Sequence, residues 1–439
     1  MSELKAIILA AGKGSRMKSD KPKVLHEIFS KPLLGWVIDS ISQIDSENEA
    51  QSIVVVGHGA DEVKTYLQKN YPTSKTVIQE QQLGTGHAVS MALDELKDFC
   101  GTVIITCGDT PLLKSNTMAQ MVNFHNENKA DVTVMSAIFE NPFGYGRIVR
   151  DNLGDVDKIV EQKDADEKQK EIKEVNAGVY CLNWANVKNA FSELKCDNAQ
   201  GEYYLTDIVA WAKSKSKKTV AYVIEDENEI LGINSRKQLA QATEIMKNTK
   251  LDELMEQGVT IYDLNSTYVS PETQIGADTV ILPNTYINGK NKIGSNCKIG
   301  PFCHFRGNVE VGDNSKIGNF VELKNAKIGS HTNVCHLSYV GDATLGSNVN
   351  IGAGTIFANY NSIAKEKNRS TLDDGVSIGS NAVIVAPVEL GENVFVGAGS
   401  VITKNVQKNS LAITRSPQKE FVDWVCAQKE SLKKDKGEN

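Results

Sequence analysis

The sequence lacks the features that would place the chain in a membrane, outside the cell or around a disulfide framework. No uninterrupted apolar run approaches the roughly 20 residues that a membrane-spanning helix needs. The N-terminus has no basic stretch followed by a long apolar stretch, so no secretion signal is expected. The eight cysteines are scattered and form no C-x-x-C pair, which argues against disulfides and zinc fingers. These absences predict a reduced, cytoplasmic protein with no membrane partner.

An excess of positive charge is also missing. The formal net charge is −7, so broad binding to nucleic acid is not expected and anions must be bound at local basic sites. With 439 residues, 40% hydrophobic and 23% charged, the chain is typical of a globular protein of two or three domains. The expected partners are therefore small-molecule substrates.

The opening stretch, LKAIILAAGKGSRMKSDKPK, predicts a phosphate-binding loop that fits neither common motif. An apolar strand leads into Gly12 and Gly14, and glycines after a strand let backbone N–H groups approach a phosphate. The glycines are too close together for a Walker loop, and Met17 stands where the dinucleotide motif needs a third glycine. Arg16 and Lys23 add positive charge nearby. The alternative is an ordinary strand-to-helix turn with solvated basic side chains.

The first half of the chain alternates strand-like and helix-like segments. Helical stretches such as 32–44 and 87–99 separate the short runs AIILA, SIVVVG, TVIITC, DVTVMSAIF, AGVYCL and TVAYVI. This alternation predicts a mostly parallel, Rossmann-like α/β sheet, with ligands beyond the carboxyl ends of its strands. Residues 235–257 contain neither proline nor glycine and predict one helix. The expected divisions are a domain at 1–236, a helical linker at 237–257, and a second domain at 258–439.

The second half follows a six-residue rule. Twelve aliphatic–glycine pairs recur after residue 270, and from Ile275 to Ile317 they are spaced by multiples of six. Such a repeat predicts a parallel β-helix, in which the aliphatic side chains fill a narrow core. The interval from Ile351 to Ile378 is not a multiple of six, so a polar loop carrying NYNSIAKEKNRST must leave the repeat there. Loops that leave a solenoid often carry function.

Seven motifs, in order along the chain, carry a resemblance to a known family. LAAGKGSRM, KPK, QQLGTGHA and CGDTPL resemble those of the sugar-nucleotide pyrophosphorylases, and CHLSYVGD, NVNIGAGT and ANY follow in the hexapeptide half. The whole chain, from about residue 5 to Arg415, resembles the bacterial bifunctional enzyme that is N-acetylglucosamine-1-phosphate uridylyltransferase and glucosamine-1-phosphate N-acetyltransferase. The resemblance implies a left-handed β-helix, a homotrimer, and supply of UDP-N-acetylglucosamine for peptidoglycan and lipopolysaccharide.

For the first half, the resemblance implies attack of the sugar 1-phosphate on UTP with release of pyrophosphate. Arg16 and Lys23 would neutralise charge on the leaving pyrophosphate. Asp109 and Asn234 would hold Mg²⁺, which prefers hard oxygen ligands, although a helix N-cap is the alternative for each. The implied contacts to UTP and N-acetylglucosamine 1-phosphate are Leu9, Ala10, Ala11, Gly12, Lys23, Gln79, Gly84, Thr85, Gly146, Glu161, Asn176 and Asn234.

For the second half, the resemblance implies transfer of an acetyl group from acetyl-CoA to the amine of glucosamine 1-phosphate. The attacking amine must be neutral, and a histidine base suits this need. His336, in CHLSYVGD, matches that base. The residues that match the sugar-phosphate site are Arg306, Lys324, Tyr339 and Asn350, and those that match the acetyl-CoA site are Asn359, Tyr360, Ser380, Ala398 and Arg415. Exposed polar residues on a solenoid face are the alternative.

The sequence departs from the family pattern at two places. Cys107 stands where the family usually has tyrosine, which puts one side-chain contact in doubt but not the metal pair. The family usually reads Asn-Tyr-Asp-Gly before a loop lysine, whereas this chain reads NYNS. The roles of Lys365 and of the loop at 361–371 are therefore left open, as is that of the C-terminal tail.

Two other functions fit parts of the pattern. A hexapeptide β-helix can hold zinc between chains through three histidines, as in the γ-type carbonic anhydrases, and His304, His331 and His336 are candidates. The first two are separated by one and a half coils of the repeat, which would place them on different faces. The other alternative is a regulatory subunit that keeps both folds without catalysis, and the complete set of charged site residues argues against it.

Overall fold

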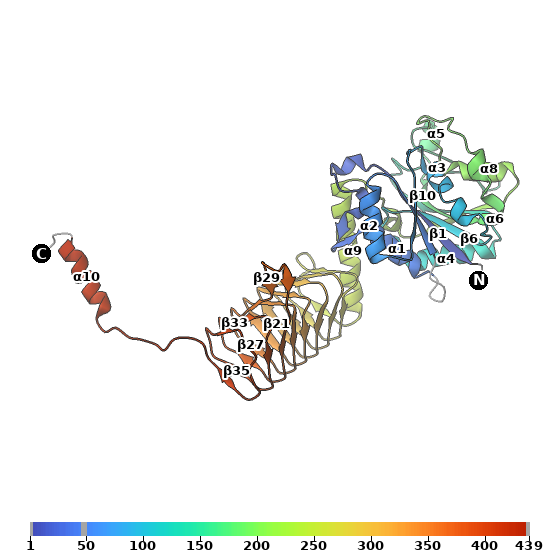
Figure 1. Ribbon diagram of the computed structural model, residues 1–439. Coiled ribbons are helices and arrows are strands. Elements are labelled where there is room, and N and C mark those ends of the chain that lie inside the picture. Colours follow the sequence, from blue (N-terminus) through green and yellow to red (C-terminus); the bar gives the residue numbers. More distant parts are fainter. Residues whose placement is uncertain (1–2, 45–50, 436–439) are drawn as a thin grey trace. The chain divides into compact units, whose positions relative to one another are not determined.

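The computed structural model describes residues 3–44 and 51–435, and it divides into two compact units, 1–249 and 250–439 (Figure 1). The boundary between the units falls within helix α9, Arg236–Glu256. The single helix expected over 235–257 is therefore confirmed. Among the described residues, no helix combines the length and the apolar character needed to cross a membrane.

The first unit is built on a mixed sheet with the strand order β11-β7-β10-β6-β1-β4-β5. Its strands are β1 (Leu4–Ala10), β4 (Gln51–Val56), β5 (Lys75–Ile78), β6 (Thr102–Cys107), β7 (Val132–Ile138), β8 (Arg147–Arg150), β9 (Val156–Val160), β10 (Glu174–Asn183) and β11 (Thr219–Ile224). The neighbours of β1 are parallel to it, whereas β10 runs antiparallel to β6 and β7, and β8 and β9 pair antiparallel beside it. All six predicted strands are confirmed. A small hairpin joins β2 (Glu27–Ile28) to β3 (Lys31–Pro32).

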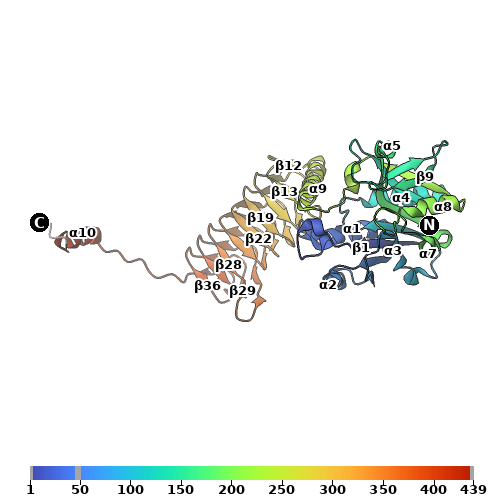
Figure 2. The same cartoon turned by 90° about the horizontal axis from the view of Figure 1, so that it is seen from above.

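Helices cover both faces of this sheet (Figures 1 and 2). They are α1 (Leu33–Ser42), α2 (Ala60–Asn70), α3 (Thr85–Ser90), α4 (Ser115–Glu127), α5 (Glu167–Lys170), α6 (Trp184–Val187), α7 (Ala190–Glu193) and α8 (Asp207–Ser214). Successive side chains of a strand point to opposite faces. Accordingly, Ile8 packs into the core lined by α1, α2 and α4, and Ile7 into the core lined by α3, α6, α7 and α8.

The helix expected over 87–99 is shorter than predicted. α3 ends at Ser90, and only the 3-10 helix η3 (Asp94–Leu96) follows. The carbonyl oxygens of Leu96 and Lys97 accept hydrogen bonds from the side chains of Trp184, at 3.0 Å, and Lys188, at 2.8 Å. These carbonyls thus have partners from a distant segment, which the local pattern of residues does not reveal.

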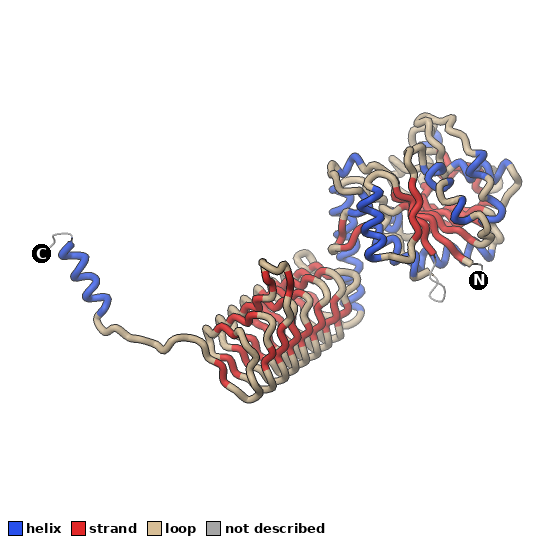
Figure 3. The backbone as a smooth tube through the Cα atoms, in the orientation of Figure 1, coloured by secondary structure: helices blue, strands red, loops and turns tan. Residues whose placement is uncertain are grey.

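The second unit is a parallel β-helix with three sheets as its sides (Figure 3). The first sheet consists of β12 (Thr260–Ile261), β15 (Val280–Ile281), β18 (Lys298–Ile299), β21 (Lys316–Asn319), β24 (Asn333–His336), β27 (Asn350–Ile351), β32 (Ser377–Ile378), β35 (Phe395–Val396) and β37 (Leu411–Ala412). The second consists of β13 (Tyr268–Val269), β16 (Tyr286–Asn288), β19 (Cys303–Arg306), β22 (Val321–Lys324), β25 (Tyr339–Gly341), β28 (Ile356–Ala358), β33 (Val383–Val385) and β36 (Val401–Ile402). The third consists of β14 (Gln274–Ile275), β17 (Asn291–Ile293), β20 (Val309–Val311), β23 (Lys327–Ile328), β26 (Ala343–Leu345), β31 (Ser370–Leu372) and β34 (Glu389–Leu390).

The length of a coil changes along this β-helix. Ile299 pairs with Ile317 across a coil of three complete hexapeptides, but Ile317 pairs with Val334 and Val334 with Ile351 across coils that are each a residue shorter. The strict six-residue spacing therefore fails in the middle of the domain, where one corner has lost a residue.

Ile351 then pairs with Ile378 across a much longer interval. The expected loop is confirmed, because this interval contains the hairpin of β29 (Tyr360–Asn361) and β30 (Glu366–Lys367). Helix α10 (Trp424–Asp435) follows the last coil.

Candidate active sites

The opening loop brings Lys23 to the carboxyl end of β1. A Cβ atom at Gly12 would meet no atom within 4 Å, so the backbone there is open to a ligand. Gly14 has φ +60, and a Cβ atom on it would lie 2.6 Å from the Cβ of Lys23. The second glycine is therefore needed because Lys23, in the 3-10 helix η2 (Lys23–Leu25), packs directly against it.

Lys23 lies between the two predicted metal ligands. Its ammonium group is 2.5 Å from Oδ2 of Asp109 and 3.0 Å from Oδ1 of Asn234. The Nδ2 atom of Asn234 donates to the carbonyl of Gly232 at 3.4 Å, so its Oδ1 atom is turned toward Lys23. Asp109 follows β6 and Asn234 precedes α9, so residues far apart in the sequence place two oxygen atoms around one positive charge.

A cavity of about 290 Å³ opens beside this group. The predicted residues that line it are Leu9, Ala10, Ala11, Gly12, Lys23, Gln79, Gly84, Thr85 and Asp109. Cys107 also lines it, and burial raises the pKa of its thiol to about 12, so the thiol stays protonated. The Nε2 atom of Gln79 donates to the carbonyl of Gly84 at 3.0 Å, which fixes the amide within the cavity wall.

Two polar lining residues, Gln82 and Glu202, were missed by the sequence reasoning. Gln82 donates to the carbonyl of Gln79 at 3.1 Å and lies in the QQLGTGHA motif, so the motif itself held a signal. Glu202 has no such signal, because it reaches the cavity only when the chain folds Tyr203 against Gly84. Arg16 is exposed in the 3-10 helix η1 (Ser15–Met17) and is not part of the cavity lining.

The other predicted sugar contacts form a second group. Gly146 and Asn176 are joined by a backbone hydrogen bond of 2.9 Å, and a Cβ atom on Gly146 would lie 3.4 Å from a carboxylate oxygen of Glu161. The structure therefore brings Gly146, Glu161 and Asn176 together. Burial, followed by the charges of Asp164 and Asp207, raises the pKa of Glu161. These two further carboxylates were not recognised in the sequence.

On the β-helix, the predicted base His336 is exposed at the end of β24. Three residues later, Tyr339 begins β25, and its hydroxyl accepts a hydrogen bond of 3.3 Å from Asn359. The same Asn359 amide donates to Asp342 at 2.5 Å, and Asn325 donates to the other oxygen of Asp342 at 2.6 Å. The structure thus brings Tyr339 and Asn359 together, in the part of the β-helix where the coils are a residue shorter.

A group of basic side chains lies on the same side of the β-helix. The Arg306 guanidinium is 2.9 Å from a carboxylate oxygen of Glu322. The neighbouring Lys367 ammonium, followed by desolvation and the Arg306 charge, lowers the pKa of Lys324. Lys367 was missed, because the sequence pointed to Lys365. In the hairpin Lys367 pairs with Tyr360, whereas Lys365 is an exposed turn residue with φ +55.

The remaining predicted residues lie farther along the β-helix. Asn350 is exposed at the start of β27. Ser380 and Ala398 occupy equivalent positions in adjacent coils, because Gly399 donates a backbone hydrogen bond of 2.8 Å to the carbonyl of Ser380. Tyr360 is 58% exposed on the hairpin, and Arg415 is exposed in the extended segment after β37.

The zinc alternative gains no support from the single chain. His304 lies on β19, His336 ends β24, and His331 stands at a corner with φ +59. Over 3–44 and 51–435, no group of three or more His, Cys, Asp or Glu residues is placed to bind a metal ion. The three histidines are therefore not assembled within one chain.

Comparison with known proteins finds a different family model in each half of the chain. Residues 5–242 match the family model described as nucleotidyl transferase, and residues 292–325 and 369–404 match the model described as bacterial transferase hexapeptide (six repeats). The bifunctional protein GlmU of Acetivibrio thermocellus is 43% identical over 97% of this chain and 98% of its own length. Those of Brevibacillus brevis and Caldanaerobacter subterraneus subsp. tengcongensis are 42% and 44% identical, each over 97% of this chain and 98% of the relative.

Fold, sites and matches define a nucleotidyltransferase joined to a hexapeptide-repeat acyltransferase. The chain belongs to the GlmU family of bifunctional proteins. The resemblance inferred from the seven motifs is thus confirmed, as are the left-handed β-helix and the two activities, uridylyl transfer and acetylation of glucosamine 1-phosphate.

The raised pKa of Glu161 predicts a pH-dependent gain in stability for Glu161→Gln. Because the folded protein holds this carboxyl at a raised pKa, ionisation at neutral pH weakens the fold, and the loss grows as pH rises through that value. Glutamine has nearly the same shape as glutamate but carries no charge at any pH. We expect the variant to melt at a higher temperature than wild type at pH 7, and the difference to vanish near pH 4.

Thermal melts across this range measure the effect. Glu171→Gln, at an exposed carboxylate ten residues later in the sequence, is the control and should melt like wild type throughout. A melting difference for Glu161→Gln that is independent of pH would contradict the assignment.

Proposed function

We propose that each half of the chain carries one complete reaction and that the residues described above perform it. The proposed divisions are residues 1–236 for uridylyl transfer, 237–257 as a helical linker and 258–439 for acetyl transfer. The observation that supports this most is the pair of separate polar groups, Lys23 with Asp109 and Asn234 on one unit and His336 with its neighbours on the other.

Mg²⁺ is the proposed metal, held by Asp109 and Asn234. The fit is supported by Lys23, whose ammonium already lies between a carboxylate oxygen and an amide oxygen. Two hard oxygen ligands from the protein, with substrate phosphates completing the shell, are typical of Mg²⁺. When bound, the metal would neutralise phosphate charge. Lys23 would then be free to neutralise, together with Arg16, the charge on the leaving pyrophosphate.

The cavity residues would orient the substrates of uridylyl transfer. The open backbone at Gly12 and the amide of Gln79 would receive the nucleotide, and Glu161 and Asn176 would bind sugar hydroxyl groups. Holding both anions in one geometry supplies much of the rate enhancement in phosphoryl chemistry.

In the β-helix, His336 would take the proton from the amine as the amine attacks the thioester carbonyl. Arg306, Lys324 and Lys367 would bind the sugar phosphate, because clustered cations favour an anion among them. Asn350 and Tyr339 would contact the sugar. Acetyl-CoA would extend past Asn359, Tyr360, Ser380, Ala398 and Arg415.

A homotrimer is proposed from the family and supported by one column of corner residues. Phe302, Phe320 and Leu337 have φ values of +54, +55 and +49, although bulky residues rarely adopt this conformation. Their exposed fractions are 47%, 56% and 62%, and the two phenylalanine rings stack with centroids 4.9 Å apart. Since Leu337 follows His336, a partner chain on this column would border the acetyltransferase site.

The cytoplasm is the proposed location, which all eight cysteines support, because each is a free thiol. The product would supply cell-wall precursors, as the family membership implies.

The role of His336 is tested by His336→Ala. Loss of a general base slows a reaction by about 10²–10⁴-fold, so acetyl transfer should fall by that factor. Uridylyl transfer, measured on the same preparation, should stay near that of wild type, and so should the melting temperature. Acetyl transfer within threefold of wild type would rule out His336 as the base.

The trimer is tested by replacing Phe302 and Phe320 with asparagine, which tolerates positive φ. Wild type should scatter light as about three times 47.9 kDa. We expect the double variant to dissociate and to lose acetyl transfer while it keeps uridylyl transfer. A double variant that remains trimeric would contradict the role of the column, and a fully active monomer would contradict the need for a trimer.

A further inference from the structure

A buried carboxylate outside the cavity connects the two segments that carry the proposed metal ligands. Glu229 is 5% exposed and lies in the 3-10 helix η4 (Glu227–Ile230). An ionised carboxylate is expensive to bury unless it is paired. Glu229 meets this need through residues 114–117, at the start of α4, which lie much earlier in the chain.

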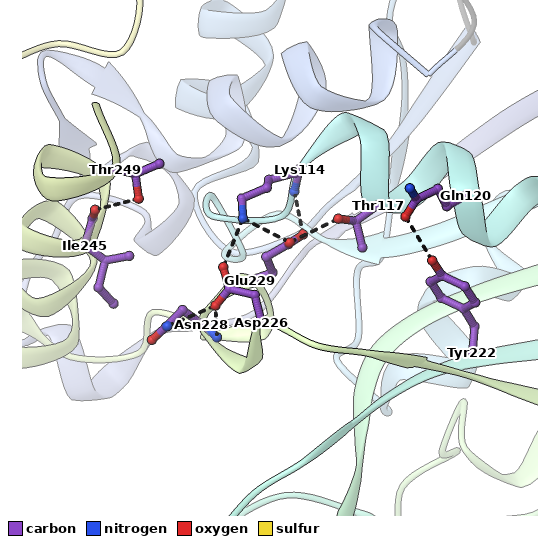
Figure 4. A network of polar contacts seen from close by, with 9 residues as sticks. All are labelled: Lys114, Thr117, Gln120, Tyr222, Asp226, Asn228, Glu229, Ile245 and Thr249. Atoms are coloured by element: carbon purple, nitrogen blue, oxygen red, sulfur yellow. Dashed lines mark hydrogen bonds and ion pairs between the residues drawn. The ribbon is translucent and has the colours of Figure 1, made fainter. Parts of the chain in front are cut away.

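The contacts of Glu229 attach η4 to the first turn of α4 (Figure 4). Its Oε2 atom accepts a hydrogen bond of 3.1 Å from the backbone N–H of Lys114. Its Oε1 atom accepts one of 3.0 Å from the hydroxyl of Thr117 and is 3.2 Å from the Lys114 ammonium. The N-cap residue of α4, Lys114, makes no side-chain cap of its own. A negative charge at a helix N-terminus is favourable, so Glu229 caps α4 from outside.

A second contact between the same two segments lies next to the proposed metal ligands. Ile233 donates a backbone hydrogen bond of 2.9 Å to the carbonyl of Asp109, and Ile233 is fully buried. In the sequence, Asp109 lies five residues before Lys114, and Asn234 lies five residues after Glu229. The segment that carries Asn234 is therefore held at both ends against the segment that carries Asp109.

Further polar contacts hold the segment around η4 and the strand β11 against α4. Asp226 binds the Lys114 ammonium at 2.9 Å and caps η4 through the backbone N–H of Asn228 at 3.1 Å. Tyr222, within β11, donates to the side chain of Gln120 in α4 at 3.1 Å. Figure 4 shows these side chains meeting between α4 and the segment after β11.

We infer that Glu229 is a positioning residue for uridylyl transfer, because it sets the distance between the oxygen atoms of Asp109 and Asn234 without touching a substrate. This inference rests on the proposed metal site at those two residues. Groups hydrogen-bonded directly to a metal ligand typically contribute about 10–100-fold to metal affinity, and Glu229, which contacts neither ligand and acts through the backbone between them, should contribute at the low end of that range. Without its charge, Glu229 should no longer hold η4 against α4, and the Asn234 oxygen should lie poorly placed.

The test is Glu229→Gln in the full-length chain. We expect the Mg²⁺ concentration for half-maximal uridylyl transfer to rise about tenfold. Hydrogen exchange at the backbone amide of Ile233 should become faster, which is a readout independent of activity. Acetyl transfer by the same preparation should be unchanged. Glu227→Gln, on the same turn but exposed, is the matched control and should behave like wild type in all three measurements.

A double-mutant cycle separates positioning from general destabilisation. If Glu229 acts through Asn234, Glu229→Gln with Asn234→Ala should need no more Mg²⁺ than Asn234→Ala alone. Additive effects, or an unchanged Mg²⁺ requirement in Glu229→Gln, would overturn the inference. Should Glu229→Gln fail to fold, Thr117→Val removes one hydrogen bond to the same carboxylate and should raise the Mg²⁺ requirement by a smaller factor, and no rise would overturn the inference.

The same measurements distinguish a wrong metal site from a wrong role for Glu229. If Asn234→Ala leaves the Mg²⁺ requirement unchanged, Asn234 is not a ligand, and both the site and the role of Glu229 are wrong. If Asn234→Ala raises it but neither Glu229→Gln nor Thr117→Val does, the metal site stands and only the inference about Glu229 is rejected.

Discussion

The ion pair between Lys23 and Asp109, with Asn234 as a third partner, is the interaction around which the first unit is organised. Both substrates of uridylyl transfer are anions, so the site must gather positive charge where water is partly excluded. The parallel pairing of β1 with β6 places the two ends of these strands side by side, and Gly14 allows Lys23 to approach. α4 and η4 then bring Asn234 to the same point.

The β-helix meets a different constraint. Its core is narrow, so each strand contributes few buried aliphatic residues. The polar residues proposed for acetyl transfer lie instead at strand ends, at corners and on the hairpin. Where a corner loses a residue, Asn325 and Asp342 come into hydrogen-bonding distance. Asp342 in turn orders Asn359 against Tyr339. The shortened coils therefore include His336 and Tyr339, two of the residues proposed for acetyl transfer.

Much of this arrangement was predictable because it depends on local pattern or on strand order. The strands, α9, the β-helix and its extruded loop all have signals in consecutive residues. Lys23 and Asp109 could be placed at one edge because the carboxyl ends of parallel strands meet there.

The features that escaped prediction depend on contacts between distant residues. Beyond the end of α3, the carbonyls of Leu96 and Lys97 accept hydrogen bonds from Trp184 and Lys188, which lie about ninety residues later in the chain. The position of Lys367 beside Lys324 depends on the hairpin in which it pairs with Tyr360, which the sequence does not reveal. Glu229 lies in the acidic run EDENE, where nothing in the sequence distinguishes the one buried carboxylate from the exposed or half-buried ones beside it.

The central claim is that the proposed metal position is the one between Asp109 and Asn234 where the Lys23 ammonium lies. Mn²⁺ titration of the nucleotide-free chain, followed by the electron paramagnetic resonance of the free ion, tests it most directly. Lys23→Met removes the ammonium at similar length, and it should bind Mn²⁺ more tightly than wild type, whereas Asp109→Asn should bind it more weakly. If Lys23→Met binds Mn²⁺ no more tightly than wild type, the ammonium does not occupy the metal position and the account is contradicted.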